Sequence, residues 1–410
     1  MTQDSLADKA RNYLEYLALD LSPRSVGTQG NRTATTVFAK IVASHGFQTS
    51  SPEFDCIDWT QDGATLAVRE QLFTAYPSPY TLECQSSATL TVVSTVSELE
   101  MADITGTILL LRGEIAKEQL MPKNFPFYNP DEHKRIIQLL ETKAPQAIIA
   151  ATTRDPQMVG AMYPFPLFED GDFDIPSVYM TDVEGDRLAT HAGEQVFLDI
   201  RARRIPAKGC NVIAWKGAQV DRKVVFTAHI DSRLGTPGAL DNASGTVTLL
   251  LLAELLQDYN RKLGVELVAI NGEDYYSNPG ELQYLEMNRE RFNHILLNIN
   301  IDDVGYFQGD SAYSLYECPH ELASLIRASF SAHEGLIEGE PWYQGDHMIF
   351  VMNQVPAMAF TSEKAMENLA TITHTAQDLP ELVDYSKLVE VARALQQLLI
   401  DIDQQFMMPG

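Results

Sequence analysis

Apolar and polar positions change their pattern along this chain, and in its second half short apolar runs alternate with helical patterns. Short, mostly apolar runs predict buried strands at 224–227, 265–270, 295–301 and 357–361. Apolar residues at helical spacing predict helices, of which the clearest are 246–256 and 385–403. Alternating strands and helices are typical of an α/β fold, in which helices cover both faces of a mainly parallel, twisted sheet.

The first 205 residues follow two other patterns. Residues 6–17 and 31–44 have apolar positions at near-helical spacing, and Gly46 supplies a stop for the second of these helices. From about residue 60 to 205, short β-like runs dominate, with one predicted helix at 130–142. This middle stretch is therefore predicted to be a compact β-rich module.

The charge of the chain excludes several classes of partner. Among 410 residues, 30 are Lys or Arg and 56 are Asp or Glu, which gives a formal net charge of −26. Such an acidic surface repels phosphate backbones and anionic lipids, so we expect neither nucleic acid nor membrane as a partner. The sequence shows no apolar run of 18 residues and no signal-peptide pattern at its start, so the expected location is cytoplasmic.

Imidazole and carboxylate side chains follow one predicted strand after another. They are His229, Asp231, Asp241, Glu273, Asp274, Asp302, Asp303, Asp346, His347 and His374. In parallel sheets the carboxyl ends of the strands meet at one edge, where ligands bind. Many carboxylates crowded together are costly unless cations neutralise them, and this mixture of nitrogen and oxygen donors suits zinc, with cobalt or manganese as alternatives.

Taken in order, these residues form motifs that resemble a known family. From about residue 209 to 385 the chain resembles the dinuclear-zinc aminopeptidase family, which includes bacterial leucyl aminopeptidases and is related to glutamate carboxypeptidase and the transferrin receptor. The matching motifs are His-x-Asp-Ser (229–232), Gly-Ala-x-Asp-Asn-x-Ser-Gly (238–245), the acidic pair 273–274, Asn-x-Asp-x-x-Gly (300–305), Gly-Asp-His (345–347) and His-Thr-x-x-Asp (374–378). The resemblance implies the zinc-exopeptidase fold.

The resemblance also implies how the chain divides into domains. The first 50 or so residues look like the N-terminal helices of this family, so residues 1–60 and 206–410 are expected to form one discontinuous catalytic domain. Residues 61–205 resemble an inserted protease-associated domain, in which Ile175-Pro176-Ser177-Val178-Tyr179 matches a recurrent stretch. The expected partners are peptides with a free N-terminus, and a homo-oligomer is left open.

The resemblance assigns a role to each motif residue. It implies two divalent ions, with zinc as the first choice: His229 and Asp302 would hold one, Asp274 and His374 the other, and Asp241 would bridge both. Glu273 would be the catalytic base, and Asp231 would orient the imidazole of His229. The family also keeps a cis peptide after the bridging residue, so we expect one at Asp241-Asn242.

The activity that follows from these roles is hydrolysis of the N-terminal peptide bond. Two metal ions would clamp a bridging water, and Glu273 would carry its proton to the leaving amine. Three positions depart from the family pattern. Asp274 stands where glutamate is usual, Asp303 stands where methionine is frequent, and Thr373 stands where some members place an oxyanion-stabilising tyrosine, so Tyr343 is considered for that function instead.

Three other functions are compatible with parts of this pattern. A carboxypeptidase or amidohydrolase on the same scaffold would need a cation for the substrate carboxylate, and Arg233 is the basic residue nearest the motifs. A non-catalytic, receptor-like protein is disfavoured because all five ligand positions and Glu273 are retained. Glutaminyl cyclase chemistry uses a related fold with one metal, whereas His229, Asp241 and His374 together favour two.

Overall fold

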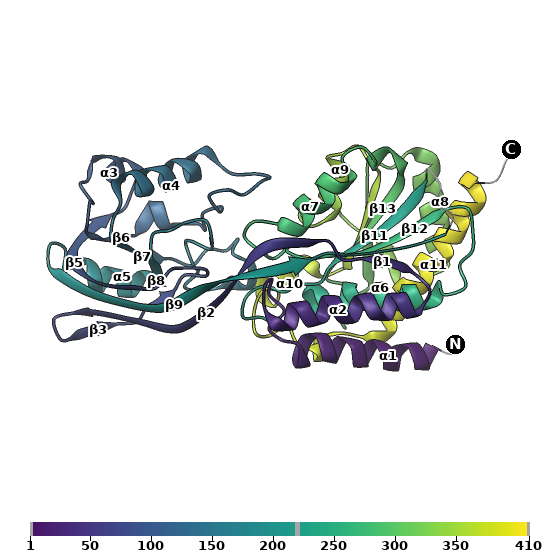
Figure 1. The fold of residues 1–410 in the computed structure, drawn as a ribbon, viewed down its shortest axis with the longest axis horizontal. Helices are drawn as coiled ribbons and strands as arrows, with labels where there is room; N and C mark the ends of the chain where they lie inside the picture. Colours follow the sequence, from purple (N-terminus) through teal and green to yellow (C-terminus); the bar gives the residue numbers. More distant parts are fainter. Residues whose placement is uncertain (1–2, 218–221, 408–410) are drawn as a thin grey trace. The chain divides into compact units, whose positions relative to one another are not determined.

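The computed structural model describes residues 3–217 and 222–407 (Figure 1). The chain divides into two compact units, one made of residues 1–56 and 208–410, and the other of residues 57–207. The first unit contains every candidate site residue, so its architecture decides where those residues lie.

An eight-stranded sheet forms the centre of the first unit, in the order β1-β10-β12-β11-β13-β16-β14-β15. The strands are β1 (Gln48–Ser50), β10 (Val212–Lys216), β11 (Lys223–His229), β12 (Gly264–Ile270), β13 (Ile295–Ile301), β14 (Ser311–Tyr316), β15 (Leu336–Glu338) and β16 (Ala357–Ser362). The four central strands, β12, β11, β13 and β16, are parallel to one another, whereas β10 pairs antiparallel with β12 and β14 pairs antiparallel with β16. All four strands predicted from apolar runs belong to this parallel centre.

Helices cover both faces of this sheet, as the alternating pattern predicts (Figure 1). On one face, α1 (Gln3–Glu15), α2 (Gln29–Ser44), α6 (Gly245–Leu255) and α11 (Tyr385–Met407) pack against one another, and α8 (His320–Phe330) packs against α11. On the other face lie α7 (Pro279–Asn288) and α9 (His347–Val351), of which α9 contacts β13 and β16. The short helix α10 (Ala365–Thr371) follows β16.

Helix α6 is the centre of the apolar layer between sheet and helices. Its sequence is apolar on every side, and its residues from Gly245 to Glu254 are all buried. A helix that is apolar all round is expected only where neighbours surround it, and α1, α2 and α11 do so here. The residues that precede α6 are thereby held at a fixed place beside the sheet.

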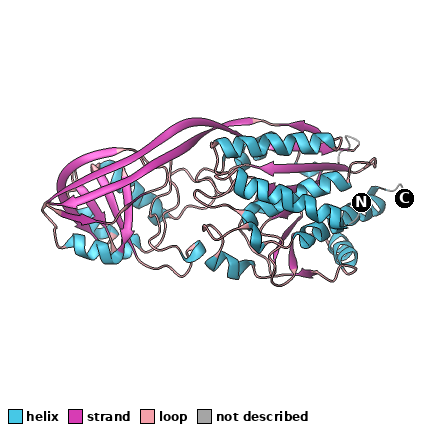
Figure 2. Cartoon of the chain, turned by 90° about the horizontal axis from the view of Figure 1, so that it is seen from below, coloured by secondary structure: helices cyan, strands magenta, loops and turns pink. Residues whose placement is uncertain are grey.

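The second unit has a sheet of its own, seen as magenta strands in Figure 2. This sheet has eight strands, in the order β3-β2-β9-β5-β6-β7-β8-β4. Its strands are β2 (Glu53–Val68), β3 (Gln71–Phe73), β4 (Tyr76–Pro77), β5 (Cys84–Val93), β6 (Ile108–Leu111), β7 (Ala147–Thr152), β8 (Ser177–Thr181) and β9 (Gln195–Cys210), and its helices are α3 (Val96–Met101), α4 (Asp131–Lys143) and α5 (Asp182–Ala189). The borders of the unit fall within β2 and β9. This unit is rich in strands, as the sequence predicts, and its resemblance to a protease-associated domain stays a prediction.

The described helices include none that combines the length and the hydrophobicity needed to cross a lipid bilayer. The cytoplasmic location expected from the sequence stays a prediction.

Candidate metal centre

The candidate residues gather at the carboxyl edge of the parallel strands. His229 is the last residue of β11, and the pairing of β11 with β12 sets it beside Ile270. Glu273 and Asp274 follow β12 after two residues, and Asp302 directly follows β13. Because these strands run in parallel, their carboxyl ends, and the side chains that follow them, meet on one edge of the sheet.

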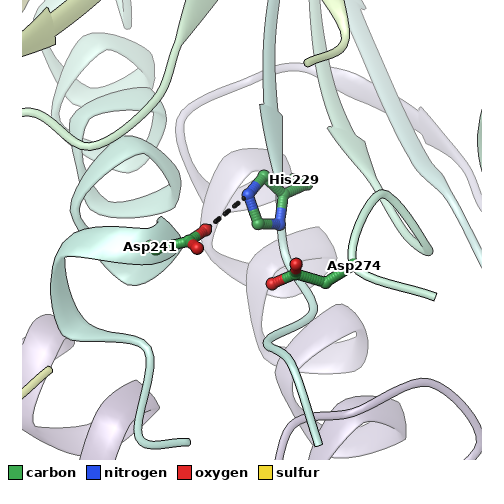
Figure 3. Close-up of side chains that lie close together, drawn as sticks. All are labelled: His229, Asp241 and Asp274. Atoms are coloured by element: carbon green, nitrogen blue, oxygen red, sulfur yellow. Dashed lines mark ion pairs between the residues drawn. The ribbon is translucent and has the colours of Figure 1, made fainter. Parts of the chain in front are cut away.

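Asp241 lies in the middle of this group, on an irregular turn, Ala239–Ser244, that leads into α6. Its two carboxylate oxygens point at different histidines. Oδ1 lies 2.9 Å from Nε2 of His229, and Oδ2 lies 3.0 Å from Nε2 of His374. Figure 3 shows the first of these contacts, with Asp274 on the other side of His229. Asp241 therefore has the geometry of a carboxylate shared between two positions.

A second carboxylate accompanies each histidine. Oδ1 of Asp274 lies 2.8 Å from Nε2 of His374, and Oδ1 of Asp302 lies 3.5 Å from Nε2 of His229. One donor atom each of His229, Asp241 and Asp274 also falls within 4.8 Å of the others. The five side chains predicted as ligands are thus brought together as two trios that share Asp241.

The backbone around Asp241 is fixed from two sides. The buried carboxylate of Asp378 accepts hydrogen bonds from the backbone N–H of Leu240 (2.7 Å) and of Asp241 (3.0 Å). Asn242 donates from Nδ2 to the carbonyl of Ile301 at the end of β13 (2.9 Å). The peptide bond Asp241-Asn242 is cis, as the family resemblance predicts.

Asp231 forms hydrogen bonds with the loop that carries Asp274, and not with the imidazole of His229. Its fully buried carboxylate accepts hydrogen bonds from the backbone N–H of Gly272 (2.7 Å) and of Asp274 (3.1 Å). Its distance to Nδ1 of His229 is 3.7 Å, which is too long for a hydrogen bond. Asp231 therefore holds the backbone that carries Asp274, while the predicted orienting role toward His229 stays a prediction.

Burial and mutual charge shift the proton affinities of the whole group. Burial opposes ionisation of Asp241, but hydrogen bonds from His229 and His374 hold its pKa well below the usual range. Burial would lower the pKa of His374, yet the charge of Asp274 and hydrogen bonds to Asp241 and Asp274 raise it to about 10. Burial raises the pKa of Glu273 well above its ordinary value, and the charges of Asp274 and Asp302 act in the same direction. The cluster thus attracts positive charge strongly.

The donor set fits divalent metal ions. Among the described residues, the buried Oδ2 of Asp274 has no hydrogen-bond partner, although buried polar atoms nearly always have one. Imidazole nitrogens and carboxylate oxygens are the ligands that zinc prefers outside thiolate sites. Ionised Asp241, Asp274, Asp302 and Glu273 would together carry the charge that two divalent cations balance.

The remaining candidates lie around this centre. Asp303 has a left-handed backbone (φ 55°), and Thr373 faces its Oδ2 at 3.5 Å. Its buried Oδ1 has no hydrogen-bond partner in the part of the chain that the structure describes. Nη1 of Arg233 lies 3.3 Å from Nδ1 of His374. Tyr343 is 71% exposed and packs edge-on against Tyr316, so its predicted role as oxyanion stabiliser rests on the sequence alone.

Two residues with clear roles in this structure were not singled out by the sequence. Asp378 ends the His-Thr-x-x-Asp motif, and that position in the motif was the available signal for it. Arg24 is buried beside the turn that leads to Asp241 and donates hydrogen bonds to the carbonyls of Pro237 and Gly238. Its sequence position, in a turn between two helices, gives no sign of burial.

Comparison with known proteins agrees with this geometry. Residues 211–399 match the family model described as Peptidase family M28. The matched segment makes up a little under half of the chain. The matched segment spans the strands, turns and loops that carry His229, Asp241, Asp274, Asp302 and His374.

Individual proteins extend the comparison. A protein of Escherichia coli strain K12, "Uncharacterized protein YfbL", is 32% identical over 142 residues, which cover 31% of this chain and only 43% of that protein. The aminopeptidase from Aneurinibacillus sp. strain AM-1 has a similar structure, with a TM-score of 0.72, 21% identity and coverage of 96% of this chain and 93% of that one. The structure of BSAP, a zinc aminopeptidase from Bacillus subtilis, is also similar, with a TM-score of 0.73 and 18% identity. The similarity covers 96% of this chain and 94% of that one. These structures confirm the predicted zinc-exopeptidase fold.

Proposed function

We propose that this protein is a dinuclear metal-dependent aminopeptidase, which hydrolyses the first peptide bond of peptides with a free N-terminus. The observation that carries the proposal is the position of Asp241, whose two oxygens face His229 and His374 at 2.9 and 3.0 Å. A carboxylate with one imidazole on each oxygen has the form of a bridge between two metal ions. The match of residues 211–399 to the model of a peptidase family supports the same reaction class.

His229 and Asp302 would hold one ion, His374 and Asp274 the other, and Asp241 both. Bound divalent ions, of which zinc is the first choice, supply Lewis-acid polarisation of a carbonyl and a more acidic water. Glu273 follows Gly272 in the loop that Asp231 anchors, next to the ligand Asp274. From there Glu273 would accept the proton of the attacking water and return it to the leaving nitrogen.

The charge around the centre favours a substrate with a free amine. Glu273 and Asp303 add carboxylates beside the two trios, one of which already contains Asp302. Within the described parts of the chain, the buried Oδ1 of Asp303 has no hydrogen-bond partner. A substrate ammonium would be attracted there, whereas a substrate carboxylate would be repelled. Both solved structures described above are named as aminopeptidases, which supports this polarity.

A carboxypeptidase is the second candidate, and Arg233 is the observation that favours it. Arg233 is partly exposed and lies beside His374, where it could receive a terminal carboxylate. Arg24 is also near the cluster, but it is fully buried and, among the described residues, donates its hydrogen bonds to backbone carbonyls, so it is not accessible to a substrate carboxylate.

One peptide in three forms separates these candidates. The free, N-acetylated and C-amidated forms are incubated with the zinc-loaded protein, and kcat/KM is measured for each. Loss of one charge-assisted hydrogen bond costs about 1.5–3 kcal/mol, or roughly ten- to a hundredfold. We expect acetylation to reduce kcat/KM by at least this factor and amidation to change it little. Equal cleavage of free and acetylated peptide, together with resistance of the amide, would replace the aminopeptidase by the carboxypeptidase.

A further inference from the structure

Arg24 is a charged side chain in the interior of the first unit. It lies in the turn between α1 and α2, and its exposed fraction is 0%. Its guanidinium donates to four backbone carbonyls, those of Leu17 (2.8 Å), Ile230 (3.3 Å), Pro237 (2.7 Å) and Gly238 (2.8 Å). Burial of a charge is costly unless its donors are all used, so an arginine with this environment must be held there by what it contacts.

Three of these carbonyls belong to the segment that joins two predicted metal ligands. Ile230 directly follows His229, while Pro237 and Gly238 lead into the turn that carries Asp241. Arg24 thus binds both ends of the loop 230–238 and fixes the spacing between the imidazole and the shared carboxylate. The packing at Gly238 is tight, since a Cβ there would lie 3.0 Å from the guanidinium and 2.4 Å from the carbonyl oxygen of Asp241.

The same N-terminal turn reaches the other ligand-bearing loop. Asn31, near the start of α2, donates from Nδ2 to the carbonyl of Arg24 (2.9 Å) and to Oδ1 of Asn271 (2.8 Å). Asn271 returns a hydrogen bond from its own Nδ2 to Oδ1 of Asn31 (3.0 Å). Asn271 precedes Gly272 and Glu273, so residues 24–31 are connected to the loops on both sides of the cluster.

The charge of Arg24 also belongs to the metal centre. Burial lowers its pKa to about 10, while the charges of Asp378, Asp231, Asp241 and Asp274 act to raise it. It therefore remains a cation at neutral pH, close to four carboxylates. Among the residues that the structure describes, carbonyl oxygens alone accept its hydrogen bonds, so its charge acts on these carboxylates through space.

We propose that Arg24 is a positioning residue of the metal centre, which holds the loop 230–238 so that His229 and Asp241 meet at ligand distance and which offsets part of the carboxylate charge. The inference rests on the proposed function, because it assumes that His229 and Asp241 bind metal. It concerns a residue that touches neither metal nor substrate, and it predicts an effect on metal affinity before any effect on peptide binding.

The test compares Arg24→Gln and Arg24→Lys with the wild type. Glutamine removes the charge and most donors, whereas lysine keeps the charge but loses the fork of donors that spans the loop. Zinc affinity is measured by competition with a chromophoric chelator, on samples whose circular dichroism shows a folded protein. Residues that orient metal ligands change affinity by about 10–100-fold when substituted, so we expect a weakening of this size for Arg24→Gln and a smaller one for Arg24→Lys.

A purely structural role would give a different result. It would lower the melting temperature of the metal-free and zinc-loaded forms equally, whereas weaker zinc binding reduces the increase in melting temperature that zinc produces. The matched control is Arg204→Gln in the second unit. Arg204 is also largely buried, and it donates to the carbonyls of Tyr80 and Phe173. Its substitution should lower stability and leave zinc affinity within about twofold of the wild type.

The outcomes separate this inference from the proposed function. If the wild type binds zinc and both Arg24 variants bind it with wild-type affinity, Arg24 is not a positioning residue, and the proposed function stands. If the wild type binds no zinc, both are overturned. If Arg24→Gln does not fold, Arg24→Lys decides: undiminished zinc affinity and an undiminished zinc-induced rise in melting temperature would refute the inference.

Discussion

Replacement of Asp241 by alanine is the sharpest test of the shared carboxylate. Asp241 supplies one oxygen to the trio with His229 and Asp302, and the other to the trio with His374 and Asp274. In the proposed centre, Asp241→Ala would therefore remove one protein ligand from each of two metal sites. His374→Ala removes a ligand from only one. The two variants should therefore differ in the number of ions that they lose. A general loss of stability would not produce this difference.

The size of the effect follows from the number of ligands. A structural zinc site with four ligands binds with about 10–16 kcal/mol, so one ligand contributes about 3 kcal/mol. Since each 1.4 kcal/mol is a factor of ten, loss of one ligand weakens a site by about two orders of magnitude. We expect Asp241→Ala to weaken both sites by this factor, and His374→Ala to leave the site of His229 near its wild-type affinity.

The assay is equilibrium dialysis against a zinc buffer, followed by elemental analysis of the protein. At a free zinc concentration about ten times the weaker wild-type dissociation constant, the wild type should hold two ions, His374→Ala one, and Asp241→Ala neither in full. Asp403→Ala is the control, because Asp403 is also buried and accepts a backbone hydrogen bond from Leu263, on a different part of the fold. An Asp241→Ala protein that retains one ion at wild-type affinity would refute the shared carboxylate.

Two further predictions concern single residues around this centre. Glu273→Gln should keep both ions and near-normal KM while kcat falls by about 10²–10⁴, and near-normal turnover of the metal-loaded variant would place the base elsewhere. His347 is buried against Trp342 and Tyr316, and burial lowers its pKa to about 4. In the unfolded chain the imidazole of His347 has a pKa of about 6.5 and binds a proton more tightly than in the folded protein. The free energy of unfolding should therefore decrease as pH falls from about 6.5 to 4, by about 3 kcal/mol over the whole range. Urea unfolding at several pH values should show a flatter profile for His347→Gln than for the wild type, and an unchanged profile would contradict the assignment.

Much of the fold was predictable because its centre is apolar. The strands β11, β12, β13 and β16 are short apolar runs bounded by polar residues, and each lies in the sheet where the alternating pattern requires it. The strands at the edges of the sheet were not predicted. β14, Ser311–Tyr316, and β15, Leu336–Glu338, mix polar and apolar residues, and their pairing depends on neighbours distant in sequence.

The meeting of His229, Asp274 and Asp302 at one edge of the sheet was predictable, because side chains that end or follow parallel strands lie close together there. Their roles as ligands, and those of Asp241 and His374, come from the family resemblance and stay predictions. The sequence could not show which oxygen of Asp241 faces which histidine. It also could not show that Asp231 reaches across to the N–H groups of Gly272 and Asp274. Such contacts join segments about 40 residues apart, and a carboxylate in a loop has the same sequence signature whether it is buried or exposed.

Asp274 illustrates why the effect of a substitution at a ligand position depends on contacts of the surrounding loop. An aspartate is one methylene shorter than the glutamate usual in the resembled family, so the sequence alone suggests a displaced or weaker second ion. In the structure, the backbone N–H of Asp274 donates a hydrogen bond to Asp231, and Oδ1 of Asp274 lies 2.8 Å from Nε2 of His374. The shorter side chain therefore reaches the imidazole from the backbone position that Asp231 holds. The length of a ligand side chain is therefore informative only together with the residues that position its loop, which here are Asp231, Asn271 and, through Asn31, the buried turn at Arg24.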